Sequence, residues 1–314
     1  MLTTTKGAIG YAPPARRRLN LDPRLLLERP TPLGITLMLP GVLLLLVFMA
    51  YPFFLGIWLS LTDSRIGMPG AYIGLRNFND LLTDSIFRQT TLNTFIYALV
   101  TVPFKLVLGL ALALVLNQQL PLRNAVRAGV LLPWIVPTAL SSLGWFMLFD
   151  PVFSPISWVL KEAGLITHNI NFLGDRELAV ASVALANIWR GIPFFAITIL
   201  AGLQTVGPEL HDAAAVDGAG VWHRFRHVTM PAIQGIVMIA TLFSIIWTFA
   251  DFQLIYVLTK GGPANQTHIF GTYAYQVGLN ATEIGQGAAI ALYMFPILAV
   301  FATILLIYLR KEEK

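Results

Sequence analysis

The sequence predicts an all-α membrane protein with six membrane-spanning helices. Hydrophobic residues make up 56% of its 314 residues and charged residues only 12%, a balance far from that of soluble domains. The apolar residues come in runs of roughly 20 or more without the alternation of strands, and such runs cross a bilayer as helices. The predicted spans are Leu33–Leu61, Thr91–Leu116, Ala125–Phe149, Leu178–Leu203, Val228–Leu258 and Gly287–Leu309.

The spans divide the chain into an N-terminal tail (1–32), a first helix (33–61), an extracytoplasmic loop (62–90), a five-helix core (91–310) and a C-terminal tail (311–314). With both termini in the cytoplasm, Lys and Arg of the inner segments outnumber those of the outer segments by roughly two to one, which is the bias that sets topology. This bias also accounts for the net charge of +5. The tail has no apolar core, so the first helix is expected to be an uncleaved anchor. The chain has no cysteine and therefore no disulfide or thiol chemistry.

The segment Glu209–Pro231 is a polar island between two apolar runs. Pro208 is suited to open a helix, and the carboxylates of Glu209 and Asp212 are favoured near its N-terminus. Asp217-Gly218 predicts a turn, followed by a second short helix over about Ala219–His227. On these grounds alone, a docking element for a soluble protein and an amphipathic loop on the membrane surface are equally good interpretations.

The island resembles the EAA loop of permease subunits of binding-protein-dependent ABC importers. That pattern is Glu-Ala-Ala, two residues, Asp-Gly-Ala, five residues, Phe, two residues, an aliphatic residue, one residue, and Leu-Pro. The matching residues are Ala213, Ala214, Asp217, Gly218, Ala219, Phe225, Val228 and Pro231. Asp212 stands in place of the usual Glu and Met230 in place of the usual Leu. Four further segments resemble the carbohydrate branch, of the maltose and glycerol-3-phosphate permease type, and the resemblance runs from Leu33 to the C-terminal end: Ile73–Phe78, Leu132–Pro137, Ile188–Phe194 and Tyr256–Pro263.

The resemblance implies the type I ABC importer permease fold in the cytoplasmic membrane of a prokaryote. It implies four kinds of partner: a second homologous permease, two ATP-binding subunits, an extracytoplasmic solute-binding protein and the lipid bilayer, with no nucleic acid. The chain has no GxxxxGK[ST] pattern, so it is expected to bind no cofactor and to catalyse nothing itself, while ATP and Mg²⁺ bind the partner ATPases. The residues expected to couple to those ATPases are Glu209, Asp212, Ala213, Ala214, Asp217, Gly218, Ala219, Trp222, Arg224 and Phe225. Among them Asp217 is expected to cap the second helix of the island.

Lys105, Arg190 and Asp251 lie within predicted spans, where a charged side chain costs about 2.5–3.5 kcal/mol and is expected to face protein or a cavity. Asp251 stands among aromatic residues, as in a sugar site, but it also suits pairing with Arg190 or a contact between helices. Its charge disfavours an acidic solute unless Arg190 or Lys105 offsets it. The candidate pathway residues are Asp251, Trp247, Phe249, Phe252, Gln253, Tyr256, Asn187, Arg190 and Tyr293, of which Asn187, Tyr256 and Tyr293 are the weaker.

The predicted function is that of the permease subunit of an ATP-driven importer for a sugar, oligosaccharide or related solute. The alternative is a secondary transporter of a small polar solute, which normally shows inverted repeats and has no need of an EAA loop. An intramembrane enzyme is disfavoured because the sequence lacks the HExxH and GxSxG motifs. The pair His223 and His227 lacks the Glu of a zinc helix, and we expect no metal there.

Overall fold

The computed structural model describes residues 30–119 and 121–312, which are mostly helical. The predicted N-terminal tail lies almost wholly outside these residues, as do the last two residues of the C-terminal tail. The chain divides into two units, with the boundary between Leu55 and Gly56. The first unit contains α2 (Pro30–Leu45), the π-helix η1 (Leu46–Ala50) and the first half of α3 (Tyr51–Ser60).

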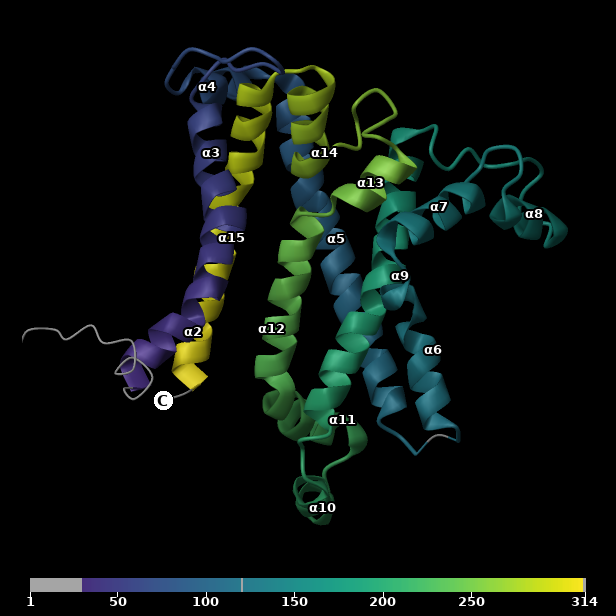
Figure 1. The fold of residues 1–314 in the computed structure, drawn as a ribbon. Helices are drawn as coiled ribbons and strands as arrows, with labels where there is room; N and C mark the ends of the chain where they lie inside the picture. The colour runs from purple at the N-terminus through teal and green to yellow at the C-terminus, as the bar shows by residue number, and fades with distance from the viewer. Residues whose placement is uncertain (1–29, 120, 313–314) are drawn as a thin grey trace, which may run out of the picture. The chain divides into compact units, whose positions relative to one another are not determined.

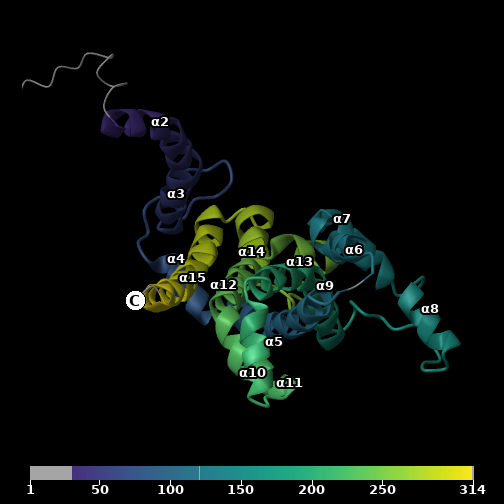
Figure 2. The ribbon, with the colours of Figure 1, turned by 90° about the horizontal axis from the view of Figure 1, so that it is seen from below.

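The second unit holds the remaining helices. They are α4 (Arg76–Thr83), α5 (Ser85–Leu116), α6 (Arg123–Ile135), α7 (Thr138–Leu148), α8 (Pro155–Glu162), α9 (Arg176–Leu203), α10 (Pro208–Val216), α11 (Val221–Arg224), η2 (Phe225–Thr229), α12 (Met230–Phe249), α13 (Phe252–Leu258), α14 (Phe270–Tyr275), η3 (Gln276–Asn280) and α15 (Ile284–Glu312). Figure 1 shows α5, α6, α9 and α12 running along one another, with α10 and α11 at one end and α8, α13 and α14 toward the other. Viewed along the bundle, α8 lies at its edge (Figure 2).

Five helices in the described part of the chain are long and apolar enough to cross a membrane, or six if one bent pair counts as a single span. The five are Leu33–Ser60, Ser85–Leu116, Arg176–Leu203, Val221–Phe249 and Ile284–Tyr308. The second begins earlier than the predicted Thr91 because the side chain of Asp84 accepts a hydrogen bond from the Ile86 amide and caps it. The prediction of an all-α membrane protein is confirmed.

Two predicted spans are interrupted. The prediction of one continuous helix over Ala125–Phe149 is wrong, because α6 and α7 meet at a bend of 86°. Val136 adopts an extended conformation there, as expected for a residue that precedes a proline. The predicted span Val228–Leu258 also ends early, at Phe249, and Asp251 lies in the break before α13 rather than inside a helix.

The most extensive helix packing in the second unit is between α5 and α9. Gly109 of α5 lies so near Phe195 of α9 that a methyl group on the glycine would overlap the phenylalanine Cβ. Val102 and Ile199 are buried in the same core, which extends to Ile233 of α12. Small residues permit this approach between helices, and dispersion contacts along it hold the two helices together.

His268 lies in the loop between α13 and α14, and its side chain is buried. Its ring contacts the Thr272 hydroxyl at 3.1 Å and Asn265 Oδ1 at 3.3 Å. Desolvation of the charged imidazole lowers its pKa from 6.5 to about 4. The unfolded chain therefore binds a proton at a higher pH than the folded chain does.

We expect the free energy of unfolding to fall as pH drops from 6.5 to about 4, where only the unfolded state takes up the proton of His268. The measurement is the thermal unfolding midpoint at about pH 7.5 and about pH 5, for the wild type and for His268→Gln. The variant should lose part of the acid sensitivity. An identical pH response in both proteins would contradict this role.

Candidate functional site

A pocket of about 510 Å³ lies where α5, α7, α9, α12 and α13 meet. Two of its helices each contribute a pair of polar side chains: Asn187 and Arg190 on α9, three residues apart, and Ser244 and Thr248 on α12, four residues apart. Lys105 of α5 and Thr138 of α7 also line the pocket. Residues three and four apart share one helix face, so each helix turns one polar stripe to the pocket. The stripe on α12 is continued by Asp251 in the break before α13.

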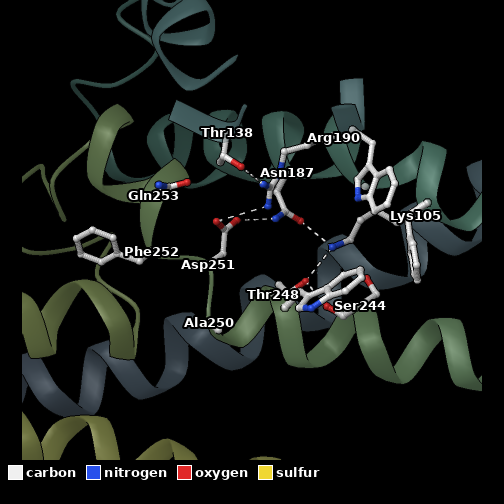
Figure 3. A pocket seen from close by; sticks show the side chains of 14 residues that line it. Lys105, Thr138, Asn187, Arg190, Ser244, Thr248, Ala250, Asp251, Phe252 and Gln253 are labelled. Carbon is white, nitrogen blue, oxygen red and sulfur yellow. Dashed lines mark hydrogen bonds and ion pairs between the residues drawn. The ribbon is translucent and has the colours of Figure 1, made fainter. Parts of the chain in front are cut away.

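Asp251 is the centre of a hydrogen-bond network (Figure 3). Its Oδ2 accepts hydrogen bonds from Asn187 Nδ2 at 2.7 Å and from the Tyr97 hydroxyl at 3.1 Å. Its Oδ1 lies 3.8 Å from Arg190 Nη2, and the Asp251 side chain is only 3% exposed. A buried carboxylate needs such partners, because unpaired burial of a charge is strongly unfavourable.

Two basic side chains enter this network. Arg190 Nη1 donates to the Thr138 hydroxyl at 2.5 Å, and Thr138 is the first residue after the bend between α6 and α7. Lys105 Nζ donates to Asn187 Oδ1 and to Thr248 Oγ1, both at 2.8 Å. The lysine stem lies against Gly191, where any larger side chain would overlap it. The network therefore joins α5, α7, α9 and the break between α12 and α13.

Aromatic side chains form the apolar part of the pocket wall. Trp134, Phe194, Trp247 and Phe252 line it. Phe194 lies between Trp134 and Trp247, with ring centroids 6.2 Å and 4.9 Å away. An apolar wall with a few converging polar groups is the usual composition of a small-molecule site.

Six of the nine pathway residues predicted from the sequence line this pocket: Asn187, Arg190, Trp247, Asp251, Phe252 and Gln253. The other three lie elsewhere. Phe249 is buried against Phe95, and Tyr256 stacks on Phe252 and meets Tyr275 edge to face. Tyr293 donates a hydrogen bond to the Phe78 carbonyl oxygen. We leave these three out of the candidate site.

The sequence analysis did not place Lys105, Thr138, Ser244 and Thr248 in the site. Lys105 could have been found because it is a charged residue within a predicted span. Ser244 and Thr248 could have been found because they lie three residues before Trp247 and Asp251, respectively, which is the spacing of one helix face. Thr138 carried no such signal, because its position follows from the bend between α6 and α7.

The polar island lies at the end of the bundle away from α13 (Figure 1). Its first helix, α10, begins at Pro208 as predicted, and its last residue is Val216. Gly218 follows the helix with a φ of +81°, which lies in the left-handed region. The Gly218 amide donates to the Ala215 carbonyl at 3.0 Å and the Ala219 amide to the Ala214 carbonyl at 2.9 Å. These two bonds are a Schellman motif, in which glycine at this position satisfies the last carbonyls of the helix.

The second half of the island differs from the prediction. Instead of a separate helix over Ala219–His227, α11 continues through η2 into α12. Pro231 is the second residue of α12, directly after η2, and the helix continues through it. The predicted cap at Asp217 is wrong, because this residue ends α10 and Gly220 precedes α11.

The island exposes large apolar side chains. Val216 is 89% exposed, Val221 77% and Trp222 70%, and the Trp222 ring stacks on Phe225 with centroids 5.4 Å apart. Of the other residues predicted for coupling, Glu209, Asp212, Ala213, Asp217 and Gly218 are exposed, and Ala214, Ala219 and Arg224 are half-buried. Contiguous exposed apolar surface of this kind marks a site of interaction with protein or membrane.

Curated relatives match nearly the whole chain. The trehalose/maltose transport system permease protein MalF of Thermococcus litoralis is 32% identical over 279 residues, which are 88% of this chain and 94% of that protein. The sulfoquinovosyl glycerol transport system permease protein SmoG of Agrobacterium fabrum is 33% identical over 296 residues, 94% of this chain and 92% of that protein.

A solved structure shares the fold. It belongs to a bacterial ABC transporter involved in the import of the acidic polysaccharide alginate, and one of its chains superposes with a TM-score of 0.79 at 22% identity, covering 93% of this chain and 100% of that one. The likeness establishes the type I permease fold. The model of the family "Binding-protein-dependent transport system inner membrane component" matches residues 105–312, and this chain, a multi-pass membrane protein, is a member of that family.

Proposed function

We propose that this chain is one permease half of an ATP-driven importer for a sugar, oligosaccharide or related solute. The observation that carries the proposal is the pocket between α9, α12 and α13, where hydrogen-bonding groups face aromatic rings. Sugars need both, because their ring faces stack on aromatic side chains and their hydroxyl groups exchange hydrogen bonds with amides and carboxylates. Its volume of about 510 Å³ lies within the range of small-molecule sites. The names of the relatives, for trehalose/maltose and sulfoquinovosyl glycerol, support the same class of solute.

A second homologous permease would complete the pathway, and an extracytoplasmic binding protein would deliver the solute. Two cytoplasmic ATPases would bind ATP and Mg²⁺, and one of them would dock on the island of each permease half. This arrangement places both termini of the chain in the cytoplasm of a prokaryote. Family membership favours the importer over a secondary transporter, and no feature of the described residues supports a secondary transporter.

In the docked state Val216, Val221 and Trp222 would lose their exposure to water, which is favourable for association. The small side chains Ala213 and Ala214 and the glycine Gly218 would permit a close approach of the ATPase. Asp212 and Arg224 would make its charged contacts, and Phe225 would support the Trp222 ring from behind.

Co-purification tests the proposal. The tagged chain is expressed with its neighbouring genes, and the proteins that remain bound are identified by mass spectrometry. We expect a second multi-pass permease and an ATPase with a Walker A motif. The variant Trp222→Ser should lose the ATPase but keep the second permease.

Leu165→Ser is the matched control, because Leu165 is 71% exposed in the loop that follows α8. Figure 1 shows α8 far from α10 and α11 of the island. The Leu165→Ser variant should retain both partners. Recovery of the chain alone as a stable homo-oligomer would contradict the importer and favour a secondary transporter.

A further inference from the structure

The pocket carries an uneven set of charges. Two basic side chains, Lys105 and Arg190, and one carboxylate, Asp251, line it. Lys105 donates its hydrogen bonds to the neutral side chains of Asn187 and Thr248. The basic side chains in the wall therefore outnumber the acidic ones, in a part of the protein that is packed between apolar helices.

The Asp251 carboxylate forms no hydrogen bond with Arg190. The carboxylate oxygen that accepts hydrogen bonds is Oδ2, and its donors are Asn187 and Tyr97. Arg190 approaches the other oxygen only to 3.8 Å, which is beyond hydrogen-bonding distance. The ion pair is therefore loose, although the carboxylate itself is almost completely buried.

Arg190 has donors to spare. A guanidinium carries five N–H groups in a planar fork suited to bidentate binding of an anion. Among the described residues it donates a single hydrogen bond, to Thr138. Its side chain is 26% exposed, and it lines the pocket (Figure 3). The apolar part of the wall is the aromatic set of Trp134, Phe194 and Trp247.

We infer that the solute carries an anionic substituent, a carboxylate, sulfonate or phosphate on a saccharide, and that this group binds the Arg190 guanidinium. This rests on the proposed function, because it assumes that the pocket is the solute pathway. The anion supplies the charge that the wall lacks, and the sugar rings lie on the aromatic side. Arg190 and Lys105 together offset the repulsion between the Asp251 carboxylate and an acidic solute.

Asp251 also has a role in release. A pathway site must bind its solute weakly enough to let it leave. The Asp251 carboxylate competes with the solute anion for the Arg190 guanidinium and so lowers the affinity for the solute. Removing the negative charge should therefore strengthen anion binding, whereas removing the positive charge should weaken it.

The test is calorimetric titration of the full-length chain, in nanodiscs with its co-purified second permease. The matched probes are methyl β-glucuronide and methyl β-glucoside, which differ in a carboxylate against a hydroxymethyl group. Inorganic phosphate is the probe for a free anion. The variants are Arg190→Gln, Arg190→Lys and Asp251→Asn, and thermal melting reports whether each is folded.

We expect the wild type to bind the glucuronide about tenfold or more tighter than the glucoside, since a charge pair at short range has that strength or more. Arg190→Gln should abolish the preference, Arg190→Lys should keep part of it, and Asp251→Asn should increase it. In each variant the affinity for the glucoside should change less than the affinity for the glucuronide. If Arg190→Gln does not fold, the increase in Asp251→Asn still tests the inference.

The inference is overturned if the two glycosides bind equally, if the glucuronide does not bind, if phosphate alone binds as well as the glucuronide, or if each substitution changes both glycosides alike. The last result would mean that Arg190 only holds the helices together. A chain that co-purifies with its ATPase yet prefers the glucoside would refute the anionic class alone. A chain without permease and ATPase partners would refute the proposed function itself.

Discussion

Replacing Asp251 by alanine is expected to destabilise the protein by about 3 kcal/mol or more, because it leaves buried donors and a cation without their partner. The hydroxyl of Tyr97, the amide of Asn187 and the guanidinium of Arg190 all face this carboxylate. The measurement is the thermal unfolding midpoint of the purified permease in nanodiscs, together with solute uptake in reconstituted vesicles. Both should fall.

Asp251→Asn separates the charge from the hydrogen bonds. An asparagine oxygen still accepts from Asn187 and Tyr97, so this variant should unfold closer to the wild type than Asp251→Ala does. Gln253→Ala is the control within the same pocket, because the Gln253 side chain is exposed. It should unfold as the wild type does. A wild-type midpoint for Asp251→Ala would show that the network contributes nothing to stability.

The second large effect is expected at Gly218. Replacement by proline removes the amide that bonds to Ala215 and demands a φ near −65°, whereas the residue has a φ of +81°. The Schellman motif cannot form, and the direction in which the chain leaves α10 must change. The membrane helices do not depend on this turn, so insertion should persist.

We expect Gly218→Pro to lower uptake by about tenfold or more, since a distortion of only about 1.4 kcal/mol at the docking surface has that effect on a rate. ATP hydrolysis by the assembled complex should no longer respond to the solute. Uptake and ATPase activity are measured in the same vesicles, and a membrane fraction blotted for the tagged chain confirms insertion.

Gly220→Ala is the matched control for this substitution. Gly220 has a φ of −68°, and a methyl group there would meet nothing within 4 Å. This variant should transport normally. Normal uptake by Gly218→Pro, in contrast, would remove the case for the island as the coupling element.

The sequence was sufficient for the features that depend on local chemistry. Long apolar runs predicted the membrane helices, and Pro208 and Gly218 marked the two ends of α10. Breaks inside apolar runs were harder to find. Pro137 and Asp251, which follow Val136 and Ala250, are single residues inside apolar runs, so the average hydropathy of each run does not reveal the bend after α6 or the gap after α12.

The candidate site was predicted in part, for the same reason. Charges such as Arg190 and Asp251 stand out in an apolar span because burying them is costly. Their mutual distance depends on the packing of α9 against the end of α12, which no sequence window contains. The partition of the aromatic residues also depends on packing: Trp247 lines the pocket, and Phe249, two residues away, lies on the other side of α12 against Phe95.

The tight contact between Gly109 and Phe195 has a mechanical consequence. Helices that pack this closely have little room to slide or tilt against each other, so α5 and α9 should move together as one rigid unit. That unit contains Lys105, Asn187 and Arg190, while Thr248 belongs to α12 and Asp251 to the break that follows it. Any motion that opens or closes the pocket must therefore separate these two sets of residues. The hydrogen bonds that it has to break run from Lys105 to Thr248, and from Asn187 and Tyr97 to Asp251.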